Sequence, residues 1–207
     1  TPGSLGQIST LIMGADAAWG DSAGKAVPNP IPNRAVVDDF VIEKVAKIIE
    51  AGSKTILLLE HQAAEQIAME FAAKISSKTG CRLSNGTFPG RVDGGPGRVA
   101  VERLPYFPEQ ILSTLDGTEN LILVGGEIPA SFFAYRGIPG QLIPEGCTVS
   151  RLTSIEEDAI DALERLADRL GVSNETINQF EKIEIAKPSG ELNTKTIIQS
   201  IAATLPE

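Results

Sequence analysis

Short, mainly apolar runs alternate along the chain with longer segments that carry one apolar face, and this alternation most constrains the fold. The runs at 54–59 and 121–124 have the length of strands that are buried on both sides. Residues 37–49 and 64–75 place apolar side chains every three or four positions, as amphipathic helices do. Strands that alternate with helices predict an α/β fold, a Rossmann-like parallel sheet of about five to six strands with helices on both faces.

Weaker signals predict the remaining elements. Pro108 suits the first turn of a helix at 109–115, and Asn33 is expected to cap the helix that precedes the first strand. Ser154 and Glu157 fit a capping box at the start of a later helix. Further strands are expected at 81–83, 141–143 and 148–152, and a short aromatic helix or turn at 131–135.

The two ends of the chain stand apart from this alternation. Pro28, Pro30 and Pro32 occupy every second position, which favours extended backbone over helix. An apolar stretch at 7–13, expected to be a strand, lies before this linker, and an amphipathic helix at 194–205 lies beyond a second linker. We therefore expect a central α/β domain flanked by the severed edges of neighbouring units, with the divisions 1–32, 33–184 and 185–207.

The charge balance excludes several classes of partner. Of 207 residues, 18 are Lys or Arg and 27 are Asp or Glu, which gives a net charge of −9. Because the basic residues are scattered, binding to nucleic acid or to an anionic membrane face is not expected. No apolar run has the length of a membrane span and the opening residues show no signal-peptide pattern, so a cytoplasmic protein is expected.

Residues that commonly carry catalysis or bind metals are sparse. Cys81 and Cys147 are far apart and form no CxxC arrangement, so reduced, buried thiols are expected. His61 is the single histidine of the chain, and no positioned partner that would make it a general base is visible. We therefore predict no catalytic residue and no metal ligand in this chain.

Two glycine-containing segments are candidates for ligand contacts. Gly125 and Gly126 follow an apolar run, at the carboxyl end of a strand, where open parallel sheets bind ligands. The segment 94–98, with Arg91 and Arg98 beside it, can form a backbone concavity for an anion. Ordinary turns are the simpler interpretation of both segments. The two glycines and the two arginines remain candidates for a ligand-binding site at the edge of the sheet, which we call the ligand edge.

Most of the aromatic side chains gather in three stretches between residues 88 and 135. They can line a pocket or dock against a neighbouring domain, and packing in a core or an interface is the favoured interpretation over ligand stacking. The residues are Phe88, Tyr106, Phe107, Phe132, Phe133 and Tyr135.

Five unusual strings of residues go beyond the fold class. They are RLSNGTFPGR at 82–91, VERLPYFPEQ at 101–110, LILVG at 121–125, FFAY at 132–135 and LIPEG at 142–146. In this order and spacing they resemble the middle domain of thiamine-diphosphate-dependent enzymes of the acetolactate synthase and benzoylformate decarboxylase family. The resemblance runs from about Ile8 to the C-terminus.

The resemblance implies a parent enzyme with a pyrimidine-binding, a middle and a pyrophosphate-binding domain. Residues 1–32 would be a remnant of the first domain with a linker, 33–184 the middle domain, and 185–207 a linker with the first helix of the third. The family's activating glutamate lies in the first domain and its metal motif, Gly-Asp-Gly, in the third, and this sequence has no Gly-Asp-Gly. The resemblance thus implies thiamine diphosphate and magnesium in the parent, and no cofactor in this fragment.

The resemblance implies that this chain is a scaffold domain of a 2-oxo acid carboligase or decarboxylase and is not catalytic in isolation. It also implies that the parent enzyme forms homo-oligomers. Some relatives hold FAD in this domain. Here Glu60 follows the first strand where glycine would admit the nucleotide, and its charge would repel a diphosphate, so FAD is not expected. Two alternatives stay open: a free-standing nucleotide-binding domain, and a subunit-interaction module that uses the aromatic side chains.

Overall fold

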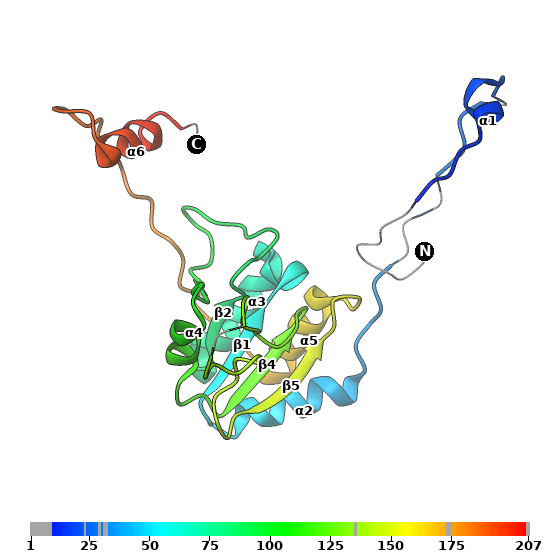
Figure 1. Cartoon of the computed structure of the whole chain (residues 1–207). Helices are drawn as coiled ribbons and strands as arrows, with labels where there is room; N and C mark the ends of the chain where they lie inside the picture. The colour runs from blue at the N-terminus through cyan, green and yellow to red at the C-terminus, as the bar shows by residue number, and fades with distance from the viewer. Residues whose placement is uncertain are drawn as a thin grey trace.

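A parallel sheet forms the centre of the domain (Figure 1). The computed structural model describes residues 10–22, 24–28, 30, 33–134, 136–172 and 175–205. The sheet has five strands in the order β3-β2-β1-β4-β5, and all neighbouring strands are parallel, which confirms the predicted Rossmann-like α/β fold. The strands are β1 (Thr55–Leu59), β2 (Arg82–Asn85), β3 (Glu102–Arg103), β4 (Asn120–Val124) and β5 (Thr148–Thr153).

Helices cover both faces of this sheet. On one face α2, α3 and α5 share an apolar cluster with alternate residues of the central strands. On the other face α4 contributes Ile111 and Leu115 to a second cluster. The short helix α1 and the last helix α6 lie away from the sheet at the ends of extended segments (Figure 1). The helices are α1 (Ala15–Trp19), α2 (Asp39–Glu50), α3 (Gln66–Thr79), α4 (Pro108–Leu115), α5 (Ala159–Leu170) and α6 (Thr194–Ala202), with a 3-10 turn η1 (His61–Ala64).

The central strand β1 has no polar residue after Thr55, because both of its faces are covered. Leu57 and Leu59 belong to the cluster beneath α2, α3 and α5, whereas Ile56 and Leu58 belong to the cluster beneath α4. All four side chains are at most 2% exposed. Because successive side chains of a strand point to opposite faces and both faces are covered, every position must be apolar.

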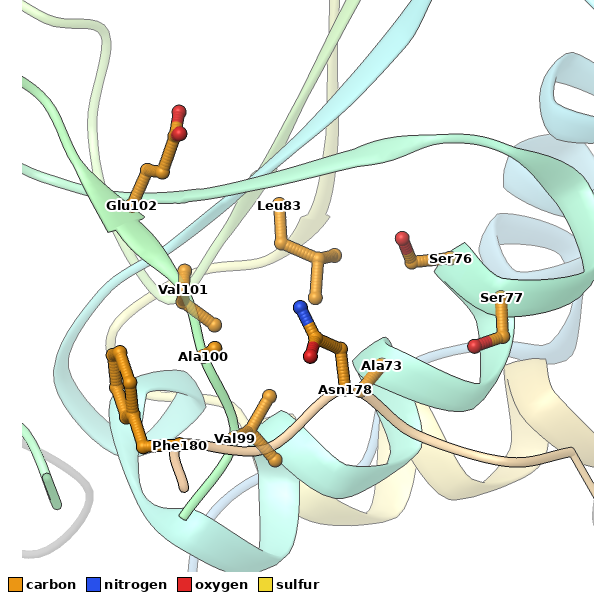
Figure 2. Close-up of a pocket in the computed structure, with 10 residues that line it drawn as sticks. All are labelled: Ala73, Ser76, Ser77, Leu83, Val99, Ala100, Val101, Glu102, Asn178 and Phe180. Carbon is orange, nitrogen blue, oxygen red and sulfur yellow. The ribbon is translucent and has the colours of Figure 1, made fainter. Parts of the chain in front are cut away.

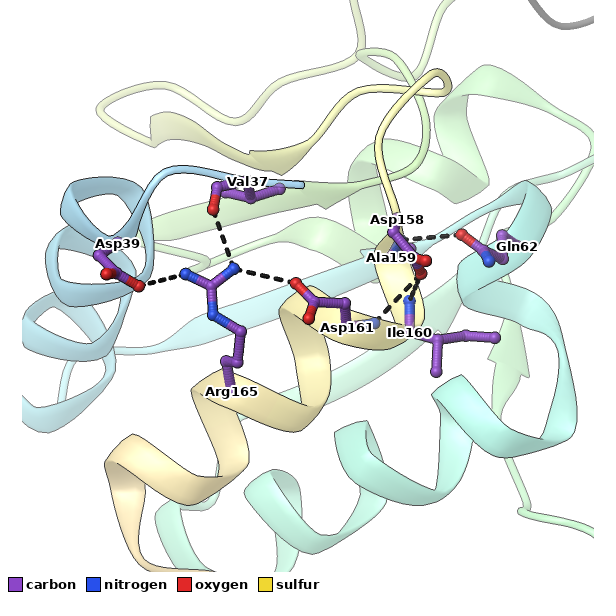
Figure 3. Close-up of polar contacts among 8 residues, drawn as sticks. All are labelled: Val37, Asp39, Gln62, Asp158, Ala159, Ile160, Asp161 and Arg165. Atoms are coloured by element: carbon purple, nitrogen blue, oxygen red, sulfur yellow. Dashed lines mark hydrogen bonds and ion pairs between the residues drawn. The ribbon is translucent and has the colours of Figure 1, made fainter. Parts of the chain in front are cut away.

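Arg165 of α5 joins this helix to the segment that leads into α2 (Figure 3). Its guanidinium donates to the Val37 carbonyl oxygen and to the Asp161 carboxylate, both at 2.9 Å, and it also pairs with Asp39 in the first turn of α2. One side chain thus satisfies a backbone acceptor and two carboxylates, and it fixes the start of α2 against α5.

Helix α2 begins later than the sequence predicts. Its cap is Asp38, whose carboxylate accepts from the Phe40 N–H at 2.7 Å, and not Asn33. The residues between these two positions lie along the segment before α5 instead, where the Ala35 N–H donates to the Glu156 carbonyl oxygen at 3.3 Å. This long-range pairing keeps the backbone extended, so the helix cannot start earlier.

The start of α5 is also later than predicted. Asp158 caps it and accepts from the N–H groups of Ile160 and Asp161 at 3.1 and 3.2 Å. The predicted capping pair is half formed, because the Glu157 carboxylate accepts from the Ser154 N–H at 2.6 Å. It closes a turn ahead of the helix and does not begin the helix itself.

Two predicted strands are not found in the described residues. At 141–143 only a single antiparallel bridge forms, between Ala130 and Gln141; Leu142 is fully buried without belonging to a strand. Residues 10–13 form no strand, and 7–9 lie outside the described residues. The two-residue strand β3 was not predicted.

The chain joins the domain near Ala35 and leaves it near Phe180. Ala35 forms a parallel bridge with Glu157, and the Phe180 carbonyl oxygen accepts from the Gly97 N–H at 2.8 Å. In contrast, no residue of α1 or α6 is buried, and Trp19 is 90% exposed. Among the described helices, none combines the length and apolar character needed to span a bilayer.

Candidate functional site

The order of the strands reverses between β1 and β4, so the carboxyl ends of these strands form the topological switch point of the sheet. Open parallel sheets bind ligands in the crevice at such a point. β1 continues into Glu60, β2 into Gly86, and β4 into Gly125 and Gly126. A cavity of about 190 Å³ lies at this edge; Glu60, Gly86 and Glu127 are among its walls, and we call it the switch-point cavity.

The three glycines at this edge make room for Glu60. A Cβ atom on Gly86 or Gly126 would overlap the Glu60 carboxylate, with one oxygen at each glycine. A Cβ atom on Gly125 would lie 2.6 Å from the Glu60 carbonyl oxygen, and Gly125 also has a left-handed φ of +76°. The two predicted ligand-edge glycines therefore do lie at the switch point, and the group that approaches them is a residue of their own chain.

Glu60 and Glu127 differ in their electrostatic surroundings. Burial raises the pKa of the Glu60 carboxyl; a hydrogen bond from the Glu127 backbone N–H and the charge of His61 oppose this only in part. The Glu127 side chain binds the Arg151 guanidinium through two hydrogen bonds of 2.7 and 2.6 Å, which lowers the Glu127 pKa. Within the described residues, Glu60 is thus the cavity carboxylate that forms no ion pair.

Glu60→Gln is expected to stabilise the domain at neutral pH and to lose this advantage in acid. The folded-state pKa of Glu60 lies above its ordinary value of 4.5, so between these two values the folded state holds more protons than the unfolded state. The wild-type domain therefore loses stability as the pH rises through this window, and the full penalty is present at neutral pH.

Urea unfolding between about pH 3.5 and 7.5 measures this effect as the difference in free energy of unfolding between variant and wild type. The difference should grow with pH for Glu60→Gln. A difference that does not change with pH would show that Glu60 is not destabilised by its surroundings.

Backbone strain marks the turn that carries Glu60. His61 has a left-handed φ of 51°, and it is the one non-glycine residue in that region among the residues described. Such a conformation costs about 1–3 kcal/mol and persists only where the surroundings impose it. Here the Glu60 N–H donates to the Val124 carbonyl oxygen and the Ala63 N–H donates to the Glu60 carbonyl oxygen, both at 3.0 Å. The two bonds hold Glu60 in place at the cavity.

Arg91 and Arg98, the basic residues of the predicted ligand edge, do not line the switch-point cavity. Arg91 pairs with Asp93 at 3.2 Å, and Asp93 accepts from the Gln66 N–H at 3.1 Å, at the first residue of α3. This carboxylate occupies the helix start, where an anion would otherwise bind. The Arg98 backbone pairs with Phe180. A ligand role for the two arginines stays a prediction, at a place separate from the two glycines.

A larger cavity, of about 350 Å³, lies beside the edge strand β3 (Figure 2). The side chains of Leu83 and Asn178 reach into it from opposite sides, and Ser76 and Ser77 border it from α3. Apart from the exposed Glu102 carboxylate, its polar groups are hydroxyls and an amide. This set of side chains offers hydrogen bonds but no paired nucleophile and base.

Five exposed aromatic side chains pack on one another. Their ring centroids lie 4.8 to 6.1 Å apart in edge-on or tilted contacts. Their exposed fractions run from 40% for Tyr106 to 62% for Phe88 and Phe132, so these rings are not core residues. No helix forms at 131–134, and Tyr135 lies outside the described residues. We call Phe88, Tyr106, Phe107, Phe132 and Phe133 the aromatic cluster.

Three residues that build the switch point were missed by sequence reasoning. Asn85 is buried, and its side-chain amide donates to the Leu59 carbonyl oxygen at 3.0 Å, at the end of β1. Gly86 and Glu127 are walls around the Glu60 side chain. Because the carboxyl ends of parallel strands share one edge, the residues after each predicted strand would have indicated this group when taken together.

In sequence, the chain is similar to a protein of Mycobacterium tuberculosis named as an acetolactate synthase large subunit, IlvX, with 36% identity over 202 residues. The match covers 97% of this chain and 38% of the relative, so the chain spans well under half of that protein's length. No model of a known protein family matches the chain.

Two solved structures share the fold. A protein of Mycobacterium smegmatis, named as a thiamin diphosphate-dependent enzyme, gives a TM-score of 0.55 at 17% identity, over 79% of this chain and 34% of its own. A thiamine diphosphate-dependent 4-hydroxybenzoylformate decarboxylase of Rhodococcus jostii gives 0.56 at 18% identity, over 78% of this chain and 33% of its own. By sequence the chain is thus similar to part of a protein named as an acetolactate synthase large subunit, and its parallel sheet has the fold of a domain found in proteins named as thiamine-diphosphate-dependent enzymes.

Proposed function

We propose that this chain is the central scaffold domain of a thiamine-diphosphate-dependent 2-oxo acid carboligase or decarboxylase, and that it is not catalytic by itself. The observation that carries the proposal is 36% identity over nearly the whole chain to a protein of which the chain spans only 38%. In the proposal, 33–184 is the central domain, and 1–32 and 185–207 belong to its pyrimidine- and pyrophosphate-binding neighbours. The parent enzyme would form homo-oligomers.

The side chains of the described residues do not fit thiamine diphosphate. The diphosphate of this cofactor is held through Mg²⁺, which needs oxygen ligands. Within the described residues, no group of three or more His, Cys, Asp or Glu side chains can hold a metal ion. At the switch point, the Glu60 carboxylate would repel a diphosphate. In the proposal, other parts of the parent bind the cofactor and Mg²⁺, and the cofactor supplies the carbanion chemistry there.

The surfaces of the outer segments support this assignment. Ile12 and Trp19 are 91% and 90% exposed, and Leu192 and Ile198 are 85% and 60% exposed. Several large apolar side chains exposed to this degree on short segments are consistent with surfaces that a partner covers. In the proposal, the neighbouring domains of the parent cover them.

Calorimetric titration with thiamine diphosphate and Mg²⁺ tests the proposal. The purified chain should give no saturable heat, whereas the full-length parent should bind the cofactor and consume a 2-oxo acid. Stoichiometric binding by this chain alone, at micromolar concentrations, would contradict the proposal, and so would turnover of a 2-oxo acid without added domains.

A second candidate, a subunit-interaction module, is favoured by the aromatic cluster. Exposed aromatic rings in mutual contact are a common source of binding energy in protein interfaces. Light scattering over a range of concentrations would detect self-association, and loss of that association in Phe132→Ser would assign it to the cluster. A monomer at every concentration would remove self-association as the role of these rings.

The geometry does not favour the third candidate, a free-standing nucleotide-binding domain. Glu60 covers the glycine backbone that a phosphate would approach. A thermal-shift screen with FAD, NAD and ADP should therefore give no stabilisation, and a clear shift with any of them would revive this candidate.

A further inference from the structure

The switch-point cavity has a net negative character. Among the residues that the structure describes, its lining contains the carboxylates of Glu60 and Glu127 and no Lys or Arg side chain. Arg151 neutralises Glu127 from outside this lining, through the bidentate pair at 2.6 and 2.7 Å. Glu60 forms no ion pair among the described residues, and His61 beside it is the one basic group that acts on it. An anionic ligand would be repelled from this cavity, and a cationic ligand would be attracted to it.

The Glu60 carboxylate has acceptor capacity that the protein leaves unused. An ionised carboxylate offers about four lone-pair sites. The Glu127 backbone N–H is its one hydrogen-bond donor among the described residues. The glycine backbones at 86 and 126 flank its two oxygens closely, so the group is held in position, and Glu60 lines the cavity.

An aromatic wall stands beside this carboxylate. Phe88 lines the cavity, and its ring contacts those of Tyr106 and Phe132 at centroid distances of 5.8 and 5.4 Å. The face of an aromatic ring attracts a cation, and Arg and Lys groups are the usual partners. The carboxylate and the ring therefore favour the same type of ligand.

The size of the cavity restricts that ligand further. At about 190 Å³, it is smaller than the roughly 300–1,000 Å³ of sites that enclose whole small-molecule ligands. Leu104 and Ile128 add apolar surface to its lining. A single cationic group on a short aliphatic stem matches this combination of size, charge and apolar wall.

We propose that the switch-point cavity binds a guanidinium or ammonium group, held by the Glu60 carboxylate and the Phe88 ring. The group can belong to a small aliphatic amine or to an Arg or Lys side chain of a docking segment; the chemistry is the same in both cases. This inference does not depend on the thiamine-enzyme assignment, because it rests on the cavity alone.

Titration of the isotope-labelled chain, followed by amide NMR shifts, tests the proposal. The probes are agmatine, as a free guanidinium compound, and the peptide acetyl-Gly-Arg-Gly-amide, as a side chain in a segment. Saturable shifts of the Gly86, Gly126 and Glu127 amides are expected with at least one probe. Binding of agmatine alone indicates a small-molecule ligand, and stronger binding of the peptide indicates a docking segment.

Three variants locate the binding. Glu60→Gln keeps the shape of the side chain and should weaken binding about tenfold or more, the usual size of a lost charged hydrogen bond. Phe88→Leu changes an exposed ring, so it should fold normally and weaken binding a few-fold. Glu109→Gln removes a carboxylate outside the cavity lining and should leave binding unchanged.

Several outcomes would overturn the proposal. One is that neither probe shifts the three amides in the wild-type chain. Another is that binding is as strong in Glu60→Gln and Phe88→Leu as in the wild type. A third is that pyrophosphate, used as an anionic probe, saturates the same amides, which would show that the cavity selects the opposite charge.

Discussion

Gly125→Ala is expected to destabilise the domain by about 2–4 kcal/mol, and no change in the Glu60 side chain should restore the loss. Two costs add at this position: a φ of +76°, which disfavours any residue with a side chain, and a Cβ atom 2.6 Å from the Glu60 carbonyl oxygen. That oxygen belongs to the backbone and accepts from the Ala63 N–H, so it cannot move away cheaply.

Gly86→Ala provides the matched comparison, because the three atoms nearest to its new Cβ atom all belong to the outer part of the Glu60 side chain and its φ is not left-handed. It should be destabilising in the wild-type background and close to neutral in Glu60→Ala, which removes these three atoms. Chemical denaturation of the single and double variants gives the coupling free energy, expected at about 1–3 kcal/mol for Gly86 with Glu60.

The same set of single and double variants with Gly125→Ala should show little coupling free energy between Gly125 and the Glu60 side chain. If Glu60→Ala rescued both glycine variants equally, the left-handed backbone and the carbonyl contact at Gly125 would not be the cause of its cost. If it rescued neither, the Glu60 side chain would not occupy the space beside Gly86.

Leu57→Ala is expected to lower the free energy of unfolding by about 2–5 kcal/mol. Leu57 lies in the central strand β1, it is fully buried, and it packs in the cluster shared by α2, α3 and α5. Removing three side-chain carbons there leaves a cavity between elements that are held on all sides, so the site cannot close over the loss. The change should appear as a lower denaturant midpoint with an unchanged slope.

Leu192→Ala makes the same chemical change outside the domain and serves as its control. Leu192 is 85% exposed, so its replacement should change the free energy of unfolding by no more than about 0.5 kcal/mol. Equal effects of the two substitutions would mean that the segment around Leu192 is part of the folded core. In the proposed full-length parent, by contrast, the Leu192 variant should become destabilising, because a neighbouring domain would cover this side chain.

The sequence by itself determined the elements whose signal is local. The apolar runs at 54–59 and 121–124 became β1 and β4, because a strand covered on both faces excludes polar residues. The helix predicted at 64–75 became α3, and Gly80 after it has the left-handed φ of 76° that ends a helix. Alternation of such elements was enough to predict a parallel sheet.

Elements whose signal depends on distant residues were not determined in this way. The two residues of β3 have no strand pattern of their own and are defined by pairing with Ser84 and Asn85. The start of α2 moved from the predicted Asn33 to Asp38, because the preceding residues pair with the segment before α5. A cap chosen from local sequence cannot account for a hydrogen bond whose partner lies more than a hundred residues away.

The candidate site shows the same division. The sequence placed Gly125 and Gly126 after a strand and Glu60 after another, and it gave the charge of Glu60. Only the tertiary structure decided that Glu60 fills the space above these glycines and Gly86, since this depends on three strand ends meeting at one sheet edge. Local patterns fix which segments become strands; the free energy of a side chain at their junction depends on burial and contacts that exist only after the sheet has formed.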